Sequence, residues 1–319
     1  MKITNKSLLP QAMVHAVTHD RYDPGDGDIS CTGLIGPAQI RRLNEVHGGE
    51  TTEDASDRIW SLMGSAVHYI IENATSDMKE KGLWHKDSIS ERRFYAEMDG
   101  KKISGQIDIF ETDDHGMAEL SDFKLTSVWS VKDALTKDGK ADWDAQLNIQ
   151  RWLMHMNGID VKNLFIVAMA RDWNKSGSMR DPDYPPKVAK IEIPMWTLQK
   201  TEGYIQSRLN AHFGKHIPQC TPDECWEKPT MYALKKKGRQ SALRVLPDEK
   251  LIMPYAADKG VATQDPDDGH WELKKDHYIE VRLGERNRCL GYCEVAPFCE
   301  QYKDWKKHVE SQQVSEQES

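Results

Sequence analysis

Residues 92–125 read RRFYAEMDGKKISGQIDIFETDDHGMAELSDFKL, and this stretch predicts three consecutive short strands. Asp99-Gly100 is a strong hairpin signal between the first two strands, and the sequence DDHG at 113–116 marks a second turn. Successive side chains of a strand point to opposite faces of its sheet. One face of the second strand carries Ile103, Gly105, Ile107 and Ile109, and the other carries Ser104, Gln106, Asp108 and Phe110. We therefore expect a three-stranded meander.

The segments on either side of the meander follow a helical period. Before it, apolar residues recur at helical spacing over residues 32–46 and 54–78. After it we expect a helix, two strands and a second helix, at 142–157, 161–170, 188–193 and 196–213. This order of elements predicts an α/β (α+β) core.

Composition limits the class of protein. The chain has 319 residues, of which 29% are charged and 38% are hydrophobic, as in a soluble globular protein. No apolar run approaches the roughly 20 residues of a membrane span, and the N-terminus has no signal-peptide core. We therefore expect a cytoplasmic protein, in a bacterium or a phage-infected host cell. The net charge of −8 weakens a nucleic-acid reading, since such binders are usually basic, but only the contact surface has to be basic.

Two aspartates and a lysine lie on the second and third predicted strands. Neighbouring strands are about 5 Å apart, so pairing brings Asp108 and Asp122 together. Two carboxylates about 4 Å apart repel by roughly 4 kcal/mol at an effective dielectric near 20, and a divalent cation removes this cost. Oxygen ligands favour Mg²⁺ or Mn²⁺, and the Phe123 carbonyl is a further candidate ligand. Lys124 shares a face with Asp122 and can orient a water or stabilise developing negative charge.

The helices that flank the meander carry further polar candidates. Gly64, His68 and Glu72 are spaced i, i+4, i+8 and share one helix face. We expect Gly64 to let its helix approach another backbone closely, so that His68 and Glu72 point at that element. The following helix carries Gln146 and Gln150, also four residues apart.

The ordered motifs G-x-x-x-H-x-x-x-E, G-x-x-D, D-x-K and a Gln-containing helix, over residues 64–150, resemble the RecB-type branch of the PD-(D/E)XK nuclease superfamily. That branch includes helicase-associated nucleases, CRISPR-associated RecB-like exonucleases and phage recombination exonucleases. The resemblance implies a restriction-endonuclease-like αβββαβ core, with a mixed central sheet flanked by helices.

The resemblance also implies roles for individual residues. His68, Asp108 and Asp122 would be metal ligands, Lys124 the catalytic lysine, and Gln146 would hold that lysine or a DNA phosphate. The candidate catalytic residues are Lys124, Asp108, Asp122, Gln146 and Glu72. Gln150 stands where the family often has Tyr. No motif is specific alone, because D-x-K occurs by chance in most proteins of this size.

The six cysteines are Cys31, Cys220, Cys225, Cys289, Cys293 and Cys299. The last three are spaced C-x3-C-x5-C and need a fourth ligand for a tetrahedral zinc or a 4Fe–4S cluster. The candidates for that ligand are Cys220, Cys225 and Cys31. Because the spacing departs from the C-x2-C zinc knuckle, iron–sulfur is favoured over Zn²⁺. Three free thiols with no metal are the remaining alternative.

Some RecB-type proteins carry a four-cysteine iron–sulfur cluster beside the nuclease core, with a similar C-terminal arrangement of three cysteines. In those proteins the fourth cysteine opens the first core helix, where this chain has Gly36-Pro37. The sequence around Cys220 resembles phage-type RecB-like nucleases, which favours Cys220 as the fourth ligand. Either metal would have a structural role in a segment poor in apolar residues.

Lys235-Lys236-Lys237-Gly238-Arg239 is the clearest basic run of the chain, with Trp226 and Tyr232 close in sequence. Lysines contact phosphates and aromatic rings stack on single-stranded bases. A solvated loop is the alternative reading of this run.

The sequence thus predicts four regions: an irregular segment at 1–30, a nuclease core at 31–214, a cysteine-containing metal-binding region at 215–308 and a disordered tail at 309–319. The predicted function is a metal-dependent DNA nuclease, with exonuclease favoured by the resemblance alone. Its partners would be DNA and a single-strand annealing protein or helicase. The sequence does not distinguish a monomer from an oligomer. The alternatives are an inactive DNA-binding protein with a decayed nuclease core and a zinc-stabilised interaction module.

Overall fold

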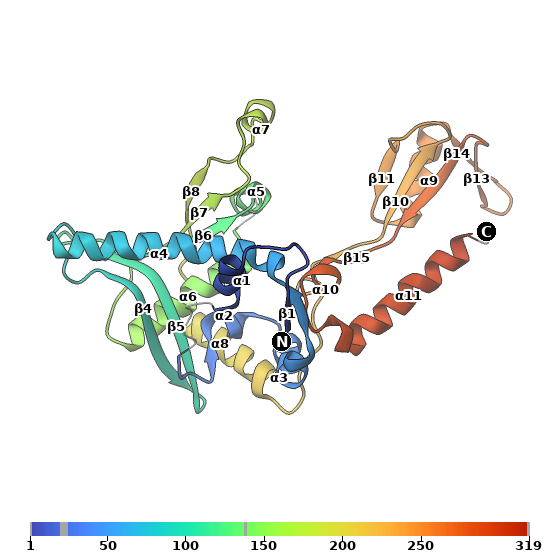
Figure 1. Cartoon of the computed structure of the whole chain (residues 1–319). Coiled ribbons are helices and arrows are strands. Elements are labelled where there is room, and N and C mark those ends of the chain that lie inside the picture. Colours follow the sequence, from blue (N-terminus) through green and yellow to red (C-terminus); the bar gives the residue numbers. More distant parts are fainter. Residues whose placement is uncertain (1, 20–24, 137–138, 318–319) are drawn as a thin grey trace. The chain divides into compact units, whose positions relative to one another are not determined.

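A computed structural model describes residues 2–19, 25–136 and 139–317 of the chain, with side chains as far as residue 311 (Figure 1). It contains two compact units, Met1–Pro218 and Gln219–Ser319. None of the helices in these described ranges is both long and apolar enough to cross a membrane. Part of the turn-rich sequence that we predicted before residue 30 lies outside the described residues.

The first unit is built on a six-stranded mixed sheet. Strands β4 (Ile89–Met98), β5 (Lys101–Thr112) and β6 (Ala118–Thr126) form the predicted antiparallel meander. Strand β7 (Asn163–Ala170) then pairs with β6 in parallel, and β8 (Val188–Glu192) pairs with β7 in antiparallel. Helices flank this sheet, which confirms the predicted α/β class with a mixed central sheet.

Three long helices of the first unit were predicted from periodicity. They are α4 (Ile59–Glu80), α6 (Ala141–Met156) and α8 (Leu198–Phe213). Helix α6 is largely buried, whereas Thr75 alone is buried among the 22 residues of α4, all of them described. Shorter elements of this unit include α5 (Val128–Thr136), α7 (Lys175–Arg180), and the 3-10 turns Gly48–Glu50 and Ala55–Arg58.

The core of the first unit lies between the sheet and α6. Ile103 and Ile107, on the face predicted to be apolar, are fully buried together with Leu147 and Leu153. Burying each such side chain stabilises the fold by roughly 1.5–3 kcal/mol. Gly105 is required by this packing, because a Cβ there would lie 2.6 Å from Leu153 Cδ1.

The N-terminal segment is more ordered than the irregular region predicted for residues 1–30. Strand β1 (Lys2–Thr4) pairs in parallel with β3 (Thr52–Asp54), α1 covers Gln11–Thr18, and β2 (Ile29–Ser30) pairs with β5. These elements are too short to show a period in the sequence. They are held by tertiary pairing, which local pattern does not reveal.

The helix predicted over residues 32–46 is two helices, α2 (Cys31–Ile35) and α3 (Ala38–His47). The break falls at Gly36-Pro37. Proline has no backbone N–H to continue a helix, and it disfavours helical geometry at the preceding residue. The apolar residues kept a helical spacing across this break, which explains why one helix was expected.

The second unit has a small core of its own. Strands β10 (Met231–Lys236), β11 (Arg244–Leu246) and β14 (His277–Arg282) form an antiparallel sheet on which helix α9 (Glu249–Asp258) packs. Its buried residues are Leu234, Ile252, Ala256 and Ala262. The shorter elements are β9 (Glu227–Lys228), β12 (Ala262–Gln264), β13 (Trp271–Leu273), β15 (Glu285–Arg286), α10 (Asn287–Gly291) and the 3-10 turn Ala296–Phe298.

Helix α11 (Glu300–Gln317) covers most of the stretch that was predicted as a disordered tail from residue 309. Neither glycine nor proline interrupts residues 309–317, and glutamate and glutamine are good helix formers. The polar composition that suggested disorder is therefore compatible with a helix that continues from an ordered start.

Candidate active site

A large cleft opens in the first unit between helix α4 and the sheet. Its volume is about 1740 Å³, and α1, α2, α4, α6 and strands β4 to β6 contribute its lining. Pockets for small molecules usually measure about 300–1,000 Å³. The cleft is therefore large enough for a segment of a polymer.

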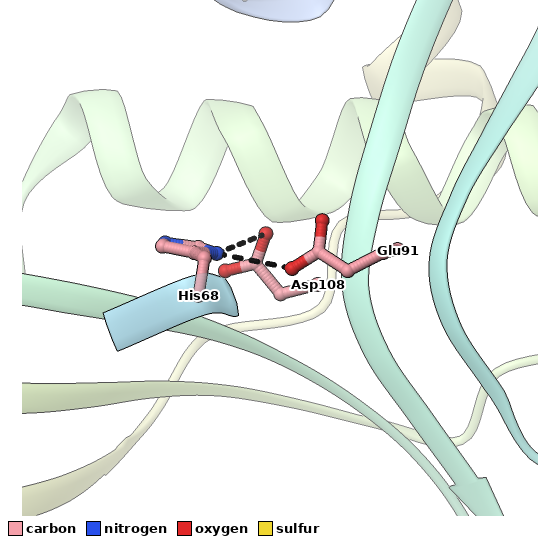
Figure 2. Close-up of side chains that lie close together, drawn as sticks. All are labelled: His68, Glu91 and Asp108. Carbon is pink, nitrogen blue, oxygen red and sulfur yellow. Dashed lines mark hydrogen bonds and ion pairs between the residues drawn. The ribbon is translucent and has the colours of Figure 1, made fainter. Parts of the chain in front are cut away.

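Three ligand-type side chains converge in this cleft, one from each of three elements (Figure 2). His68 comes from α4, Glu91 from β4 and Asp108 from β5. The His68 Nδ1 atom lies 3.1 Å from Glu91 Oε1 and 3.7 Å from Asp108 Oδ1. One ligand atom of each residue falls within 4.8 Å of the others. An imidazole with two carboxylates is a donor set that a divalent cation such as Mn²⁺ accepts, so these residues fit a metal ion.

Glu91 has an unusual backbone. Its φ is +49°, in the left-handed region that costs a residue with a Cβ roughly 1–2 kcal/mol. In the β4–β5 register, Ser90 faces Ile109 and Arg92 faces Ile107, so Glu91 stands opposite Asp108 at the one position where pairing is interrupted. Strained backbone of this kind concentrates at functional sites.

Sequence reasoning missed Glu91 because the strand was predicted to begin at Arg92, whereas β4 begins at Ile89 and includes Glu91. A usable signal was nevertheless present. A two-residue turn at Asp99-Gly100 pairs Met98 with Lys101, and counting back in that register places Glu91 beside Asp108. The Gln106 amide donates to Glu91 Oε2 at 2.7 Å and holds the carboxylate in place.

A second polar group adjoins the first. Lys124 Nζ lies 2.7 Å from Asp122 Oδ2 and donates to Gln146 Oε1 at 2.9 Å. The Gln146 amide nitrogen in turn donates to Asp122 Oδ1 at 2.5 Å. The backbone N–H of Phe123 donates to Asp108 Oδ2 at 2.7 Å and so connects the two groups. The structure thus brings the predicted Asp108, Asp122, Lys124 and Gln146 together.

Burial and mutual charge set the protonation of the group. The hydrogen bond to Glu91, with the nearby Asp108 carboxylate, raises the pKa of His68 to about 9 against the opposing effect of burial. Burial, and then the charge of Asp122, raise the pKa of Asp108 well above its usual value. Burial lowers the pKa of Lys124, but the adjacent Asp122 outweighs it and leaves a net rise. A cation would relieve the crowding of carboxylates that these shifts report.

The other predicted residues, Glu72, Gly64 and Gln150, do not belong to these two polar groups. Glu72 is exposed and lines the cleft, but the carboxylate on His68 comes from Glu91. The expected close approach at Gly64 is wrong, because a Cβ there would meet nothing within 4 Å among the described residues. Helix α4 therefore stands off from its neighbours at that point. Gln150 is buried, and its amide donates to the Gln106 carbonyl at 2.9 Å.

The cysteines divide between the two units. Cys31 is buried in the first unit, where its thiol donates to the Gln146 carbonyl at 3.5 Å. It therefore serves the core beside the candidate site, which argues against Cys31 as a ligand of a C-terminal metal. The five cysteines of the second unit are Cys220, Cys225, Cys289, Cys293 and Cys299.

The five thiols of the second unit influence one another. Burial, and then the charges of neighbouring thiols, raise the pKa of Cys220 and of Cys289 to about 12. The thiols of Cys225 and Cys289 share a hydrogen bond. Within the described residues, however, no three thiols approach to 4.8 Å, so they do not form a ready metal cluster. The predicted cysteine metal stays a prediction.

The basic run of the second unit is partly neutralised. Lys235 pairs with Glu280 at 2.8 Å, and Lys236 pairs with Asp276 at 3.4 Å. These pairs lower the charge that this run presents to a phosphate backbone, so its case as a DNA contact is weaker than its sequence implied.

No family model matches this sequence, and no curated protein matches it. Among solved structures, the chain is similar to SSO0001 over 68% of this chain and 86% of that one, with 15% identity and a TM-score of 0.42. It is also similar to a presumed exonuclease from Eubacterium rectale over 50% of this chain and 70% of that one, with 15% identity and a TM-score of 0.32. Likenesses this distant assign no family to the chain.

Proposed function

We propose that this chain is a metal-dependent nuclease that hydrolyses phosphodiester bonds in DNA, of the RecB-like PD-(D/E)XK type that its motifs resemble. One observation carries the proposal. A ligand set of His68, Glu91 and Asp108 adjoins the Asp122–Lys124–Gln146 group in a cleft large enough for a polymer.

The metal would be Mg²⁺ or Mn²⁺. His68, Glu91 and Asp108 would hold it, with Asp122 and the Phe123 carbonyl as further candidates. A bound divalent cation supplies an activated water and neutralises charge on the scissile phosphate. The buried Asp108 carboxylate is kept in position for this ligation by the Phe123 N–H.

Lys124 has a separate task. Its ammonium is fixed by Asp122 and Gln146, and its raised pKa keeps it protonated at neutral pH. A fixed positive charge beside the metal set is placed to stabilise the negative charge that develops on a phosphate under attack. Gln146 acts by positioning, because it holds both partners of the pair.

An exonuclease is favoured over an endonuclease on the motif resemblance. The rival reading, an inactive DNA-binding protein, is disfavoured because every polar position of the site is filled. The test compares linear duplex DNA with covalently closed circular duplex of the same sequence, in Mn²⁺ and in EDTA. We expect loss of the linear form in Mn²⁺ alone. Asp108→Asn should abolish that loss, whereas cutting of the closed circle would show an endonuclease.

For the second unit we propose a structural metal on Cys289, Cys293 and Cys299, either an iron–sulfur cluster or the rival Zn²⁺. Cys220 is the favoured fourth ligand, and the hydrogen bond between Cys225 and Cys289 makes Cys225 its competitor. Metal analysis of purified protein should find iron with visible absorbance, or zinc without colour. Cys293→Ser should lose the metal, and a wild type without metal would end this proposal.

We further propose a cytoplasmic setting in a bacterium or phage-infected cell, with an annealing protein or helicase as partner. Co-purification of tagged chain from such a cell would test this setting. The cellular setting has no bearing on the proposed chemistry of the active site.

A further inference from the structure

Two exposed aromatic rings lie together in the second unit. Trp226 is 43% exposed and Tyr292 is 74% exposed. Their ring centroids are 5.1 Å apart, with the planes inclined at 63°. The guanidinium of Arg288 lies 4.4 Å from the centroid of the Trp226 ring. We call Trp226, Tyr292 and Arg288 the aromatic platform.

The backbone holds Trp226 in an unfavourable conformation. Its φ is +51°, and a left-handed backbone is a true outlier for a bulky residue. The N–H of Trp226 donates to the Asp223 carbonyl at 3.0 Å, and its own carbonyl accepts from Asn287 at 3.4 Å. The strained turn is therefore fixed by main-chain bonds, while the ring it presents stays half-exposed. Burial of the ring does not account for the strain, which points to a use of the ring at the surface.

Each of the two aromatic residues has a cysteine next to it in sequence. Cys225, which precedes Trp226, is buried, and its carbonyl accepts from the Arg288 N–H at 3.1 Å. Cys293 follows Tyr292 directly. The rings thus project from the part of the second unit where the thiols gather.

Arg288 gives the platform a fixed positive charge. Its Nη1 donates to the Glu224 carbonyl at 2.8 Å, which orients the guanidinium over the indole. In the described part of the chain no carboxylate forms an ion pair with Arg288. A cation beside two exposed rings matches a ligand that has flat aromatic groups and negative charge.

We infer that the aromatic platform binds single-stranded nucleic acid, with bases stacked on Trp226 and Tyr292 and a phosphate near Arg288. Binding of this kind extends the proposed nuclease function, and its biological role rests on that function. A protein partner fits less well. Fully exposed, each ring would offer only about 150–250 Å², whereas a stable protein interface takes roughly 800 Å² from each side.

The test is the anisotropy of a fluorescein-labelled 20-nucleotide oligodeoxythymidine, titrated with the full chain in EDTA so that no cleavage occurs. Trp226→Gly removes the ring and suits the left-handed backbone, so the melting temperature should hold or rise. Affinity for the oligonucleotide should nevertheless fall about tenfold. Tyr292→Ala should act in the same way, and Tyr292→Phe, which keeps a ring, should bind like wild type.

Trp129→Ala is the matched control, because Trp129 is 69% exposed and lies in the first unit. It should leave binding unchanged. Wild-type affinity in Trp226→Gly and Tyr292→Ala would overturn the inference and leave a protein partner as the occupant of the platform. A melting temperature several degrees lower in Trp226→Gly would also overturn it, by showing that the ring is structural. Binding without any cleavage in Mn²⁺ would support the platform and refute only the proposed nuclease function.

Discussion

Glu91 combines a strained backbone conformation with a specific side-chain contact. Its left-handed φ aims the carboxylate at His68, 3.1 Å away, and Gln106 fixes that carboxylate from the other side. The Arg93 guanidinium in turn donates to Gln106 Oε1 at 2.9 Å. Two side chains in series, Arg93 and Gln106, thus support the Glu91 carboxylate. Such supporting shells orient metal ligands in other sites.

Replacing Glu91 with Gln should weaken Mn²⁺ binding by about 10- to 100-fold or more, because even supporting residues of metal sites have effects of this size. The measurement is a calorimetric Mn²⁺ titration. Glu97→Gln is the matched control, since Glu97 is an exposed residue of the same strand. Equal affinities for wild type and Glu91→Gln would remove Glu91 from the ligand set.

The pKa of His68 gives a stability test with a definite sign. Its folded-state pKa is about 9, above the ordinary 6.5. The stability that the protonated ring contributes is therefore fully present below pH 6.5 and is lost as pH rises through 9. Thermal melts in EDTA should show wild type exceeding His68→Gln most at pH 6 and least above pH 9. A difference independent of pH would contradict the ion pair with Glu91.

At the scale of elements, the sequence predicts that helix α4 and the β4–β5 hairpin form, but it does not predict all of their surroundings. Periodicity predicted α4, but the exposure of its large apolar residues Trp60, Met63 and Ile70 does not follow from that periodicity. The hairpin turn was predicted correctly. The interruption of strand pairing at Glu91, opposite Asp108, involves a strained backbone that no local sequence pattern encodes. Residues on one strand were therefore easier to predict than their partners across the sheet.

Substitutions at two glycines test how closely α4 and β5 pack against their neighbours. Gly64→Ala should stabilise the fold by about 0.5–1 kcal/mol, because glycine is unfavourable inside a helix and the new Cβ meets nothing within 4 Å. Gly105→Ala should destabilise it by roughly 1–3 kcal/mol, because its Cβ would overlap Leu153. Urea unfolding of both variants measures these changes. Destabilisation by Gly64→Ala would mean that α4 approaches another element more closely than described.

At the scale of the whole molecule, the two units divide the predicted chemistry. The first contains the cleft with Asp108, Asp122 and Lys124, whose proximity followed from the expected pairing of consecutive strands. The second contains five thiols and a separate core, where spacing predicted a metal but could not predict how the thiols lie. Cysteine spacing fixes no partner across a loop, so the sequence left Cys220, Cys225 and Cys31 as candidates for the fourth ligand, and the contact with Cys289 now adds weight to Cys225.

Lys124 and a divalent metal are proposed to act together on DNA. The rate at which wild type and Lys124→Met degrade end-labelled linear DNA in Mn²⁺ tests this proposal, with EDTA as the metal-free control. We predict degradation by wild type in Mn²⁺ alone. Lys124→Met should be about 10²–10³-fold slower, the usual cost of one charge-stabilising donor, although the variant still binds Mn²⁺. Intact DNA after incubation with wild type, or an unchanged rate in Lys124→Met, would contradict the claim.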